Sequence, residues 1–344
     1  MKKIHMVDVV SMYNSHASTI DKKIKNVITS GSYIQGLEVD SFEKKLSSFL
    51  KSKFVISCGN GTDALYVAMM ALNLKKGDEV LVPSFTFVST VEAVCLLGLV
   101  PIFIDIDPGT FLLNHKLISK NISRRTKAII PVHLFGQCCD MVEIKKVAKK
   151  YNLHIVEDAA QSIGSTCIYN EKKKIKFSGT IGDIGITSFY PSKNLGAFGD
   201  GGAIFTQNKK LANKIKLIVN HGQNKKYHHQ IVGLNSRLDA IQAAILSFKL
   251  TLLKEHNNKR QNFAKEYDSR LLALDWVKTP VIREGSDHIY HQYSIILHNR
   301  IIRKKFQAYL ASKNIPTMIY YPIPLHKQKA YRMYHTKPLP ISEK

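Results

Sequence analysis

Short apolar runs alternate with longer stretches of helical periodicity over the first two-thirds of the chain. Runs rich in β-branched and aromatic residues predict seven strands, at residues 54–57, 79–82, 101–104, 127–131, 154–157, 184–189 and 202–206. Apolar positions three and four apart predict helices between them, including 62–72 and 141–151. Continuous apolar strands separated by helices are typical of a sheet that is covered on both faces. The pattern therefore predicts an α/β fold with a mostly parallel seven-stranded sheet.

From about residue 236 the pattern changes. The segment Leu238–Leu253 and a polar continuation to Leu274 predict one long helix. A short strand, a helix and another short strand are predicted to follow, up to Tyr321. We therefore expect a large domain at residues 1–240 and a small C-terminal α+β domain at residues 241–344.

Segments with polar side chains follow four of the predicted strands. Ligands bind at the carboxyl ends of the strands in parallel sheets, so a site is expected in these segments. They are CGNGTDAL at 58–65, PSFTF at 83–87, VEDAAQS at 156–162 and SFYPSKNLGAFGDGGAIF at 188–205.

The first two segments offer an anion site and an aromatic ring. Gly61 and Thr62 lie where a helix is predicted to begin, and the N–H groups and partial positive charge of a helix start favour a phosphate. The same residues also suit an ordinary helix cap, so the motif alone leaves both interpretations open. Phe87 either packs in the core or stacks on a flat cofactor.

The third segment places a carboxylate at the end of a strongly apolar strand. An unpaired Asp158 would be costly there. It could hold the pyridine nitrogen of pyridoxal phosphate (PLP) protonated, or it could cap a helix. Gln161, three residues later, could bind the ring hydroxyl of the same cofactor.

The fourth segment places one lysine in a frame of small, turn-forming residues between two apolar strands. A lysine forms a Schiff base with an aldehyde, which PLP provides, and this makes Lys193 the candidate residue. Ser188 could join Thr62 in binding the phosphate. Together the four segments offer partners for four parts of one aldehyde cofactor: its phosphate, its ring face, its ring nitrogen and its aldehyde carbon.

The strong positive charge does not change this interpretation. A formal net charge of +24 and a pI of about 9.7 would admit nucleic acid, an anionic membrane or anionic small molecules as partners. The lysines, however, come as short runs over the whole chain, such as 172–174 and 225–226. No zinc-finger spacing or RNA-binding signature accompanies them. We therefore expect a dispersed basic surface, no nucleic-acid partner and no metal site.

The cysteines and the apolar windows indicate a cytoplasmic protein. The five cysteines form no CxxC pair, and most lie in or beside apolar runs. The N-terminus lacks the sustained apolar core of a signal peptide. The most apolar window, 88–104, contains Glu92, Gly98 and Pro101, so we expect no membrane partner.

At this level of detail the chain resembles the DegT/DnrJ/StrS family of sugar aminotransferases, which are PLP enzymes with the aspartate aminotransferase fold (fold type I). The resemblance runs from about residue 5 to residue 331. It is carried by the segments GNGTDAL, EVLVPSFTFVST, PIFIDIDP, PVHLFGQ, IVEDAAQSIG, SFYPSKNLGAFGDGGAI and NSRLDAIQAAIL.

The resemblance implies a role for each residue of the predicted site. Lys193 is then the Schiff-base lysine, Asp158 the partner of the pyridine nitrogen and Gln161 the contact of the ring hydroxyl. Phe87 stacks on the ring. The phosphate would be bound by Gly61, Thr62 and Ser188. Asn235 would reach the phosphate of a neighbouring subunit, because family members build each site at the interface of a homodimer.

The resemblance also implies a substrate. The segments 226–244 and 319–331 look most like those of enzymes that aminate C-3 of dTDP-3-keto-6-deoxyhexoses, with L-glutamate as the donor. Amination at C-4 or of a UDP-sugar stays open, and the product would enter a glycan such as lipopolysaccharide or capsule. Contacts to the sugar or diphosphate are expected from Tyr190, Lys226, Tyr227, Tyr320 and His326. Without the resemblance, these residues could equally be packing aromatics, a solvated lysine and a core or surface histidine.

Two alternatives to an active aminotransferase have to be considered. Related PLP enzymes that dehydrate deoxysugars carry a histidine in place of the lysine, and Lys193 argues against that reaction. Family members usually continue for some tens of residues beyond the position of Tyr331, whereas this chain stops at Lys344. We therefore expect uncovered apolar surface on the small domain, and an inactive or regulatory relative stays open.

Overall fold

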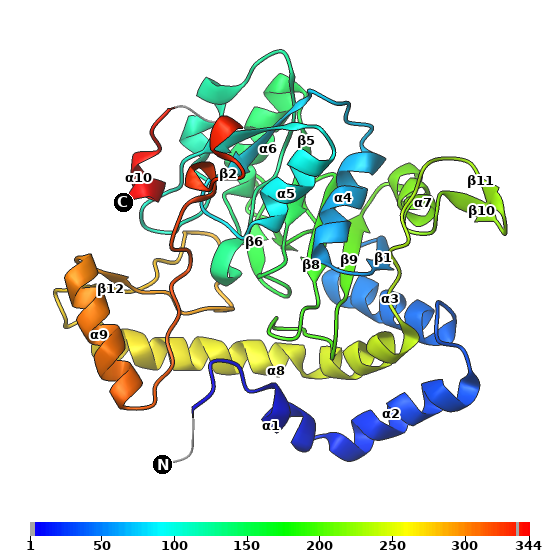
Figure 1. Ribbon diagram of the computed structural model, residues 1–344, viewed down its shortest axis with the longest axis horizontal. Helices are drawn as coiled ribbons and strands as arrows, with labels where there is room; N and C mark the ends of the chain where they lie inside the picture. The colour runs from blue at the N-terminus through cyan, green and yellow to red at the C-terminus, as the bar shows by residue number, and fades with distance from the viewer. Residues whose placement is uncertain (1–3, 335–336) are drawn as a thin grey trace.

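The computed structural model describes residues 4–334 and 337–344. Its centre is a seven-stranded sheet in the order β1-β9-β8-β5-β4-β2-β3 (Figure 1). The strands are β1 Phe54–Cys58, β2 Glu79–Pro83, β3 Val100–Ile104, β4 Thr126–Ile129, β5 His154–Asp158, β8 Ile184–Ser188 and β9 Gly202–Thr206. Only β9 runs antiparallel to its neighbours β1 and β8, so six of these seven strands point the same way. The prediction of a mostly parallel seven-stranded sheet is confirmed.

Helices cover both faces of this sheet because its strands are apolar on both sides. Along β1, Val55 and Ile56 belong to different apolar cores, as alternation in a strand requires. One core holds residues of α4 Gly61–Ala71, α5 Ser89–Leu96, α6 Met141–Tyr151 and α7 Lys209–Ile218. The other holds residues of α2 Ala17–Ser30, α3 Leu37–Leu50 and α8 Ala240–Leu271. Helix α1, Val9–Asn14, precedes α2 and buries none of its residues.

Local sequence explains where the helices of the first core begin and end. The side chains of Asn60, Asp140 and Asn208 accept hydrogen bonds from the first turns of α4, α6 and α7, respectively. Helix α6 has Glu143 in its first turn and lysines in its last, which suits the helix dipole. It ends at Asn152 in the left-handed conformation, which asparagine tolerates.

Helix α8 runs along one face of the sheet and continues to the C-terminal region (Figure 1). Beyond it, β12 Val277–Lys278 pairs with β13 Ile296–Leu297, and α9 Arg300–Ser312 follows. The predicted order of strand, helix, strand is therefore wrong, because both strands precede the helix and no strand lies between α9 and Tyr321. Pro316, which lacks an N–H for pairing, interrupts that last apolar segment.

The C-terminal segment returns to the sheet. Short turns at Leu325–Lys327 and Arg332–Tyr334 lead to α10, Pro340–Glu343. Leu325 and Leu339 are buried in the same core as α4 and α5. By contrast, α9 buries none of its residues, and its Ile301 and Tyr309 are exposed. In the ranges that the structure describes, no helix combines the length and apolar composition needed to cross a membrane.

Candidate active site

The four predicted site segments meet at one edge of the sheet. Strands β1, β2, β5 and β8 are mutually parallel, so the segments that follow them lie at the same edge. Two hydrogen bonds tie the first and third segments to helix α5, which follows the second segment: one joins Thr62 and Ser89, and the other joins Thr90 and Asp158. The sequence-predicted residues of the four segments therefore lie around a common region.

Lys193 lies in the loop between β8 and β9. Its backbone N–H donates to the carbonyl of Tyr190 at 2.8 Å, which fixes the turn that carries it. Burial lowers the pKa of its amine to about 8, and the negative charge of Asp158 only partly opposes this shift. The neutral amine, which a nucleophile or general base requires, is therefore far more populated near neutral pH than for an ordinary lysine.

Asp158 is the last residue of β5 and is 5% exposed. One carboxylate oxygen accepts the hydroxyl of Thr90 at 2.9 Å, and the other accepts the N–H of Ala160 at 3.1 Å. Burial raises its pKa, while these two hydrogen bonds and Lys193 act in the opposite direction. The helix-cap interpretation does not apply, because a turn and not a helix follows this residue.

Gln161 ties the segment after β5 to the chain after β4 and to the C-terminal region. Its Oε1 accepts the N–H of Phe135 at 2.8 Å, and its Nε2 donates to the hydroxyl of Tyr321 at 3.2 Å. Burial raises the pKa of Tyr321 to about 12, so this phenol stays protonated at neutral pH. The amide thus has a fixed orientation at the edge of the site.

Gly61 and Ser188 form a close contact between the start of α4 and the end of β8. A Cβ on Gly61 would lie 2.6 Å from the Cβ of Ser188, so only glycine fits. Asn60 supplies the side-chain cap of α4, so the capping role considered for Thr62 belongs to its neighbour. The hydroxyl of Thr62 instead lies 2.7 Å from that of Ser89. Two hydroxyls and a helix N-terminus therefore lie together, a donor set that fits a phosphate.

The aromatic residues after β2 have different environments. Phe85 packs against Phe111 and Tyr321, with ring centroids 5.7 and 5.6 Å away. Phe87 is 55% exposed, so its ring is not used in the core. The buried hydroxyl of Thr86, between them, has no hydrogen-bond partner among the described residues. Of the two phenylalanines, Phe87 is the one that is free to stack on a ligand.

Three predicted residues lie on exposed segments. Lys226 and Tyr227 form the tip of the hairpin of β10 Gln223–Lys225 and β11 His228–His229, which projects from the body (Figure 1). Asn235 is exposed, and its neighbour Ser236 donates to Asp63 of α4 at 2.7 Å. Neither the hairpin nor Asn235 contacts the Lys193 loop through a recorded hydrogen bond within the described residues.

The remaining three predicted residues lie in different places. Tyr190 is 56% exposed, and its carbonyl accepts from the Lys193 N–H. Tyr320 makes an edge contact with Phe135, whose N–H is bound by Gln161. His326 is 2% exposed, and its Nε2 lies 3.0 Å from Glu343 of α10, so it is placed as a core histidine.

Sequence reasoning missed two side chains beside this site. Thr90 binds Asp158 but carries no periodic signal, and it is one of several hydroxyls in the segment FTFVST. His291 lies 3.1 Å from the Oδ1 of Asn194, the residue after Lys193. Burial and the charges of Lys193 and Arg260 hold its pKa well below the ordinary value, so His291 is neutral at neutral pH.

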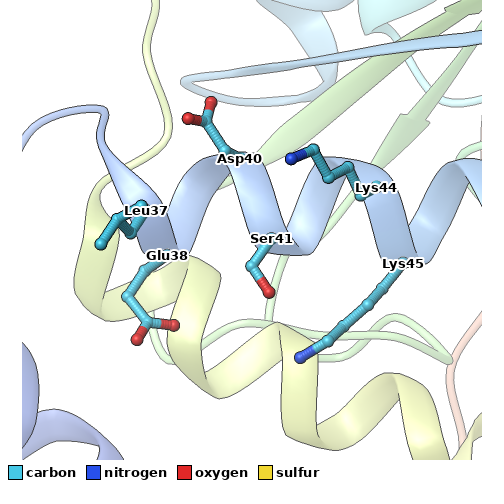
Figure 2. Close-up of a pocket in the computed structure, with 6 residues that line it drawn as sticks. All are labelled: Leu37, Glu38, Asp40, Ser41, Lys44 and Lys45. Carbon is cyan, nitrogen blue, oxygen red and sulfur yellow. The ribbon is translucent and has the colours of Figure 1, made fainter.

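A separate depression on α3 does not belong to this site. Figure 2 shows it along the outer side of that helix, and none of the predicted site residues lines it. Its lining residues are Leu37, Glu38, Asp40, Ser41, Lys44 and Lys45. Two carboxylates on the first turn are followed by two amines one turn later, as on an ordinary solvated helix face.

Comparison with known proteins gives this arrangement its context. Residues 14–344 match the model of the DegT/DnrJ/EryC1/StrS aminotransferase family. A Pseudomonas aeruginosa protein named UDP-2-acetamido-2-deoxy-3-oxo-D-glucuronate aminotransferase is 44% identical over 98% of this chain and 92% of its own. The dTDP-3-amino-3,6-dideoxy-alpha-D-galactopyranose transaminase of Aneurinibacillus thermoaerophilus is 41% identical over 99% of this chain and 91% of its own.

A solved structure shows the same fold with a cofactor. The NtdA protein of Bacillus subtilis, crystallised with its cofactor PMP, superposes with a TM-score of 0.90. It is 33% identical and covers 99% of this chain and 78% of its own. These relatives confirm the predictions of an aspartate aminotransferase-like fold, a PLP-type cofactor and an aminotransferase. The chain belongs to the DegT/DnrJ/EryC1/StrS aminotransferase family.

Proposed function

We propose that this protein transfers an amino group from L-glutamate to the C-3 keto group of a nucleotide-linked sugar. The observation that carries the proposal is the pair of Lys193, with its lowered pKa, and buried Asp158, beside a hydroxyl-lined helix N-terminus. PLP, when bound, supplies an aldehyde that accepts the amino group and a ring that delocalises charge from the donor carbon.

Each site residue would have its own role toward the cofactor or the donor. Gly61, Thr62 and Ser188 would hold the phosphate at the start of α4. Asp158 would face the ring nitrogen with its charge, and Gln161 would bind the ring hydroxyl. Phe87 would cover the ring. Lys193 would take a proton from the Cα of L-glutamate as a general base, since burial lowers the pKa of its amine to about 8.

The names of the relatives agree on position 3 of the sugar but differ in the nucleotide. The Pseudomonas relative is named for a 3-oxo sugar linked to UDP, and the Aneurinibacillus relative for a 3-amino sugar linked to dTDP. Both nucleotides carry a diphosphate, which needs cationic or N–H partners. We propose a 3-ketosugar acceptor, with dTDP-3-keto-6-deoxyhexose and a UDP-linked 3-ketosugar as the two candidates. C-4 amination is the alternative.

We further propose that the protein works as a homodimer in the cytoplasm. Large apolar side chains are exposed on the N-terminal helices and in the β10–β11 hairpin and the loop after it, as on surfaces that a second copy covers. They include Val10, Ile28, Leu37, Tyr227 and Val232, with exposures from 51% to 86%. In such a dimer Asn235, Lys226 and Tyr227 would contribute to the partner's site.

The test is an assay of purified, PLP-loaded protein with L-glutamate and a panel of UDP- and dTDP-linked 3-keto and 4-keto sugars. We expect 2-oxoglutarate and an amino sugar from a 3-ketosugar, and loss of both in Lys193→Met. Lys174→Met, which removes an exposed lysine, is the matched control. Turnover by Lys193→Met, or no reaction with any member of the panel, would overturn the proposal.

A further inference from the structure

The first turn of α5 links two parts of the proposed cofactor site. Ser89 and Thr90 are the first two residues of this helix. The hydroxyl of Ser89 lies 2.7 Å from that of Thr62, in the proposed phosphate site. The hydroxyl of Thr90 lies 2.9 Å from a carboxylate oxygen of Asp158. Two consecutive hydroxyls thus reach the phosphate end and the ring-nitrogen end of the site.

The bond from Thr90 has a fixed direction. Asp158 has to be ionised to hold a ring nitrogen protonated, and an ionised carboxylate only accepts hydrogen bonds. Thr90 is therefore the donor, and with 1% exposure it is shielded from bulk water. A buried hydrogen bond to a charged acceptor is stronger than one between neutral groups.

The second donor to the Asp158 carboxylate is the backbone N–H of Ala160. The main chain of Asp158 is also held, since its N–H donates to Pro131 and its carbonyl accepts from His133. Thr90 therefore supplies the one recorded side-chain hydrogen bond to this carboxylate within residues 4–334 and 337–344. It is the contact that a substitution can remove without altering Asp158 or the backbone.

We propose that Thr90 is a positioning residue that keeps Asp158 ionised and fixes the plane of its carboxylate for the cofactor. This inference rests on the proposed PLP-dependent function. Without the hydroxyl, one buried carboxylate oxygen would lose its partner, and burial would favour the neutral acid. A neutral acid gives the ring nitrogen no negative charge to pair with, so both cofactor affinity and proton abstraction suffer.

The test compares Thr90→Val, which keeps the shape but removes the donor, with Thr90→Ser, which keeps the donor. PLP affinity is measured by titrating cofactor-free protein and following its fluorescence. The rate of the L-glutamate half-reaction is measured in single turnovers. We expect Thr90→Val to weaken PLP binding by roughly tenfold, and Thr90→Ser to stay within about twofold of wild type.

The same pair is then made in an Asp158→Asn background, with the urea midpoint of each variant as the folding control. If Thr90 acts through Asp158, Thr90→Val weakens PLP binding by less than about twofold further in the Asp158→Asn protein. An equal loss of PLP affinity in the wild-type and Asp158→Asn backgrounds would overturn the inference while leaving the proposed function intact. Wild-type PLP affinity in Thr90→Val would do the same. A wild-type protein that binds no PLP would overturn both. PLP binding without sugar amination would overturn the proposed function alone.

Discussion

Gly61 and Ser188 lie so close that a single methyl group on Gly61 would overlap the Ser188 side chain. The two residues belong to segments 127 positions apart in sequence, and a Cβ on Gly61 would lie 2.6 Å from the Cβ and 3.2 Å from the Cα of Ser188. This contact brings the start of α4 against the end of β8, where the phosphate is expected to bind.

We therefore expect Gly61→Ala to displace the start of α4 and weaken PLP binding at least tenfold. The overlap is with the Cβ of Ser188, which cannot move without its backbone, so a stability loss of about 1–3 kcal/mol should accompany it. Cofactor titration and urea unfolding measure the two effects. Gly109→Ala is the matched control, because its Cβ would approach no atom closer than 3.4 Å. Wild-type affinity in Gly61→Ala would show that this contact does not shape the phosphate site.

The lowered pKa of Lys193 predicts how the stability of the cofactor-free protein varies with pH. In the unfolded chain this amine keeps its proton up to pH 10.5, but in the folded protein only up to about pH 8. Between these values the unfolded state binds more protons, so the free energy of unfolding rises with pH. Below pH 8 the lysine is charged in both states, and keeping this charge buried destabilises the folded protein. A pKa shift of this size makes that cost roughly 3 kcal/mol at most.

Lys193→Met removes this contribution. We expect the variant to be more stable than wild type at pH 7 and to lose that advantage as the pH rises from 8 towards 10.5. Urea unfolding of both cofactor-free proteins across this range measures the difference in their free energies of unfolding, to which titrating groups that Lys193 does not influence contribute nothing. A difference that stays constant with pH would show that the lysine is solvated in the folded protein.

The hairpin residue Tyr227 offers a test of the proposed substrate contacts. Its ring is 80% exposed, with the amine of Lys226 5.2 Å from the ring centroid. If the hairpin reaches a sugar nucleotide, Tyr227→Ala should raise the KM for the sugar at least tenfold. The stability should change by less than about 0.5 kcal/mol, because little of the ring is buried. Steady-state kinetics measure the KM for the sugar, and urea unfolding measures the stability.

Tyr309→Ala is the matched control, since this exposed tyrosine on α9 also has a lysine over its ring, at 5.6 Å. We expect it to leave the KM unchanged. An equal KM for wild type and Tyr227→Ala would remove the hairpin from the substrate site.

The sequence predicts the sheet well because each strand is a continuous apolar run, which is a local signal. Asp158 and Ser188 end two of these strands and Lys193 lies in the loop after Ser188, so the sequence alone singles them out as candidates. The supporting contacts are less predictable because they join distant segments. Thr90 and Asp158 are 68 residues apart, and a hydroxyl in a helical turn has no pattern that identifies its partner. The prediction of a strand after α9 is wrong for a related reason. A short apolar segment becomes a strand only where another strand pairs with it.

The longest-range contacts in this fold attach the C-terminal segment to the sheet, and they predict its importance for stability. The carboxylate of Asp105, 3% exposed, accepts the backbone N–H groups of Ile341 and Ser342 at 2.9 Å and the hydroxyl of Ser342 at 2.5 Å. That hydroxyl also lies 2.5 Å from the hydroxyl of Ser84, at the start of the segment that carries Phe87. Helix α10 thus holds, through Ser84, the segment that carries Phe87.

We expect Asp105→Asn to lower the free energy of unfolding by about 2 kcal/mol. An amide can accept with only one of its two polar atoms, so one of the N–H groups of α10 loses its partner. Urea unfolding measures this loss, and Asp275→Asn, at an exposed position, is the control. Ser342→Ala should weaken PLP binding by a smaller factor than Gly61→Ala, because it acts on Phe87 only through Ser84. If Asp105→Asn unfolds at the wild-type urea concentration, α10 is held by the burial of Leu339 and not by this carboxylate.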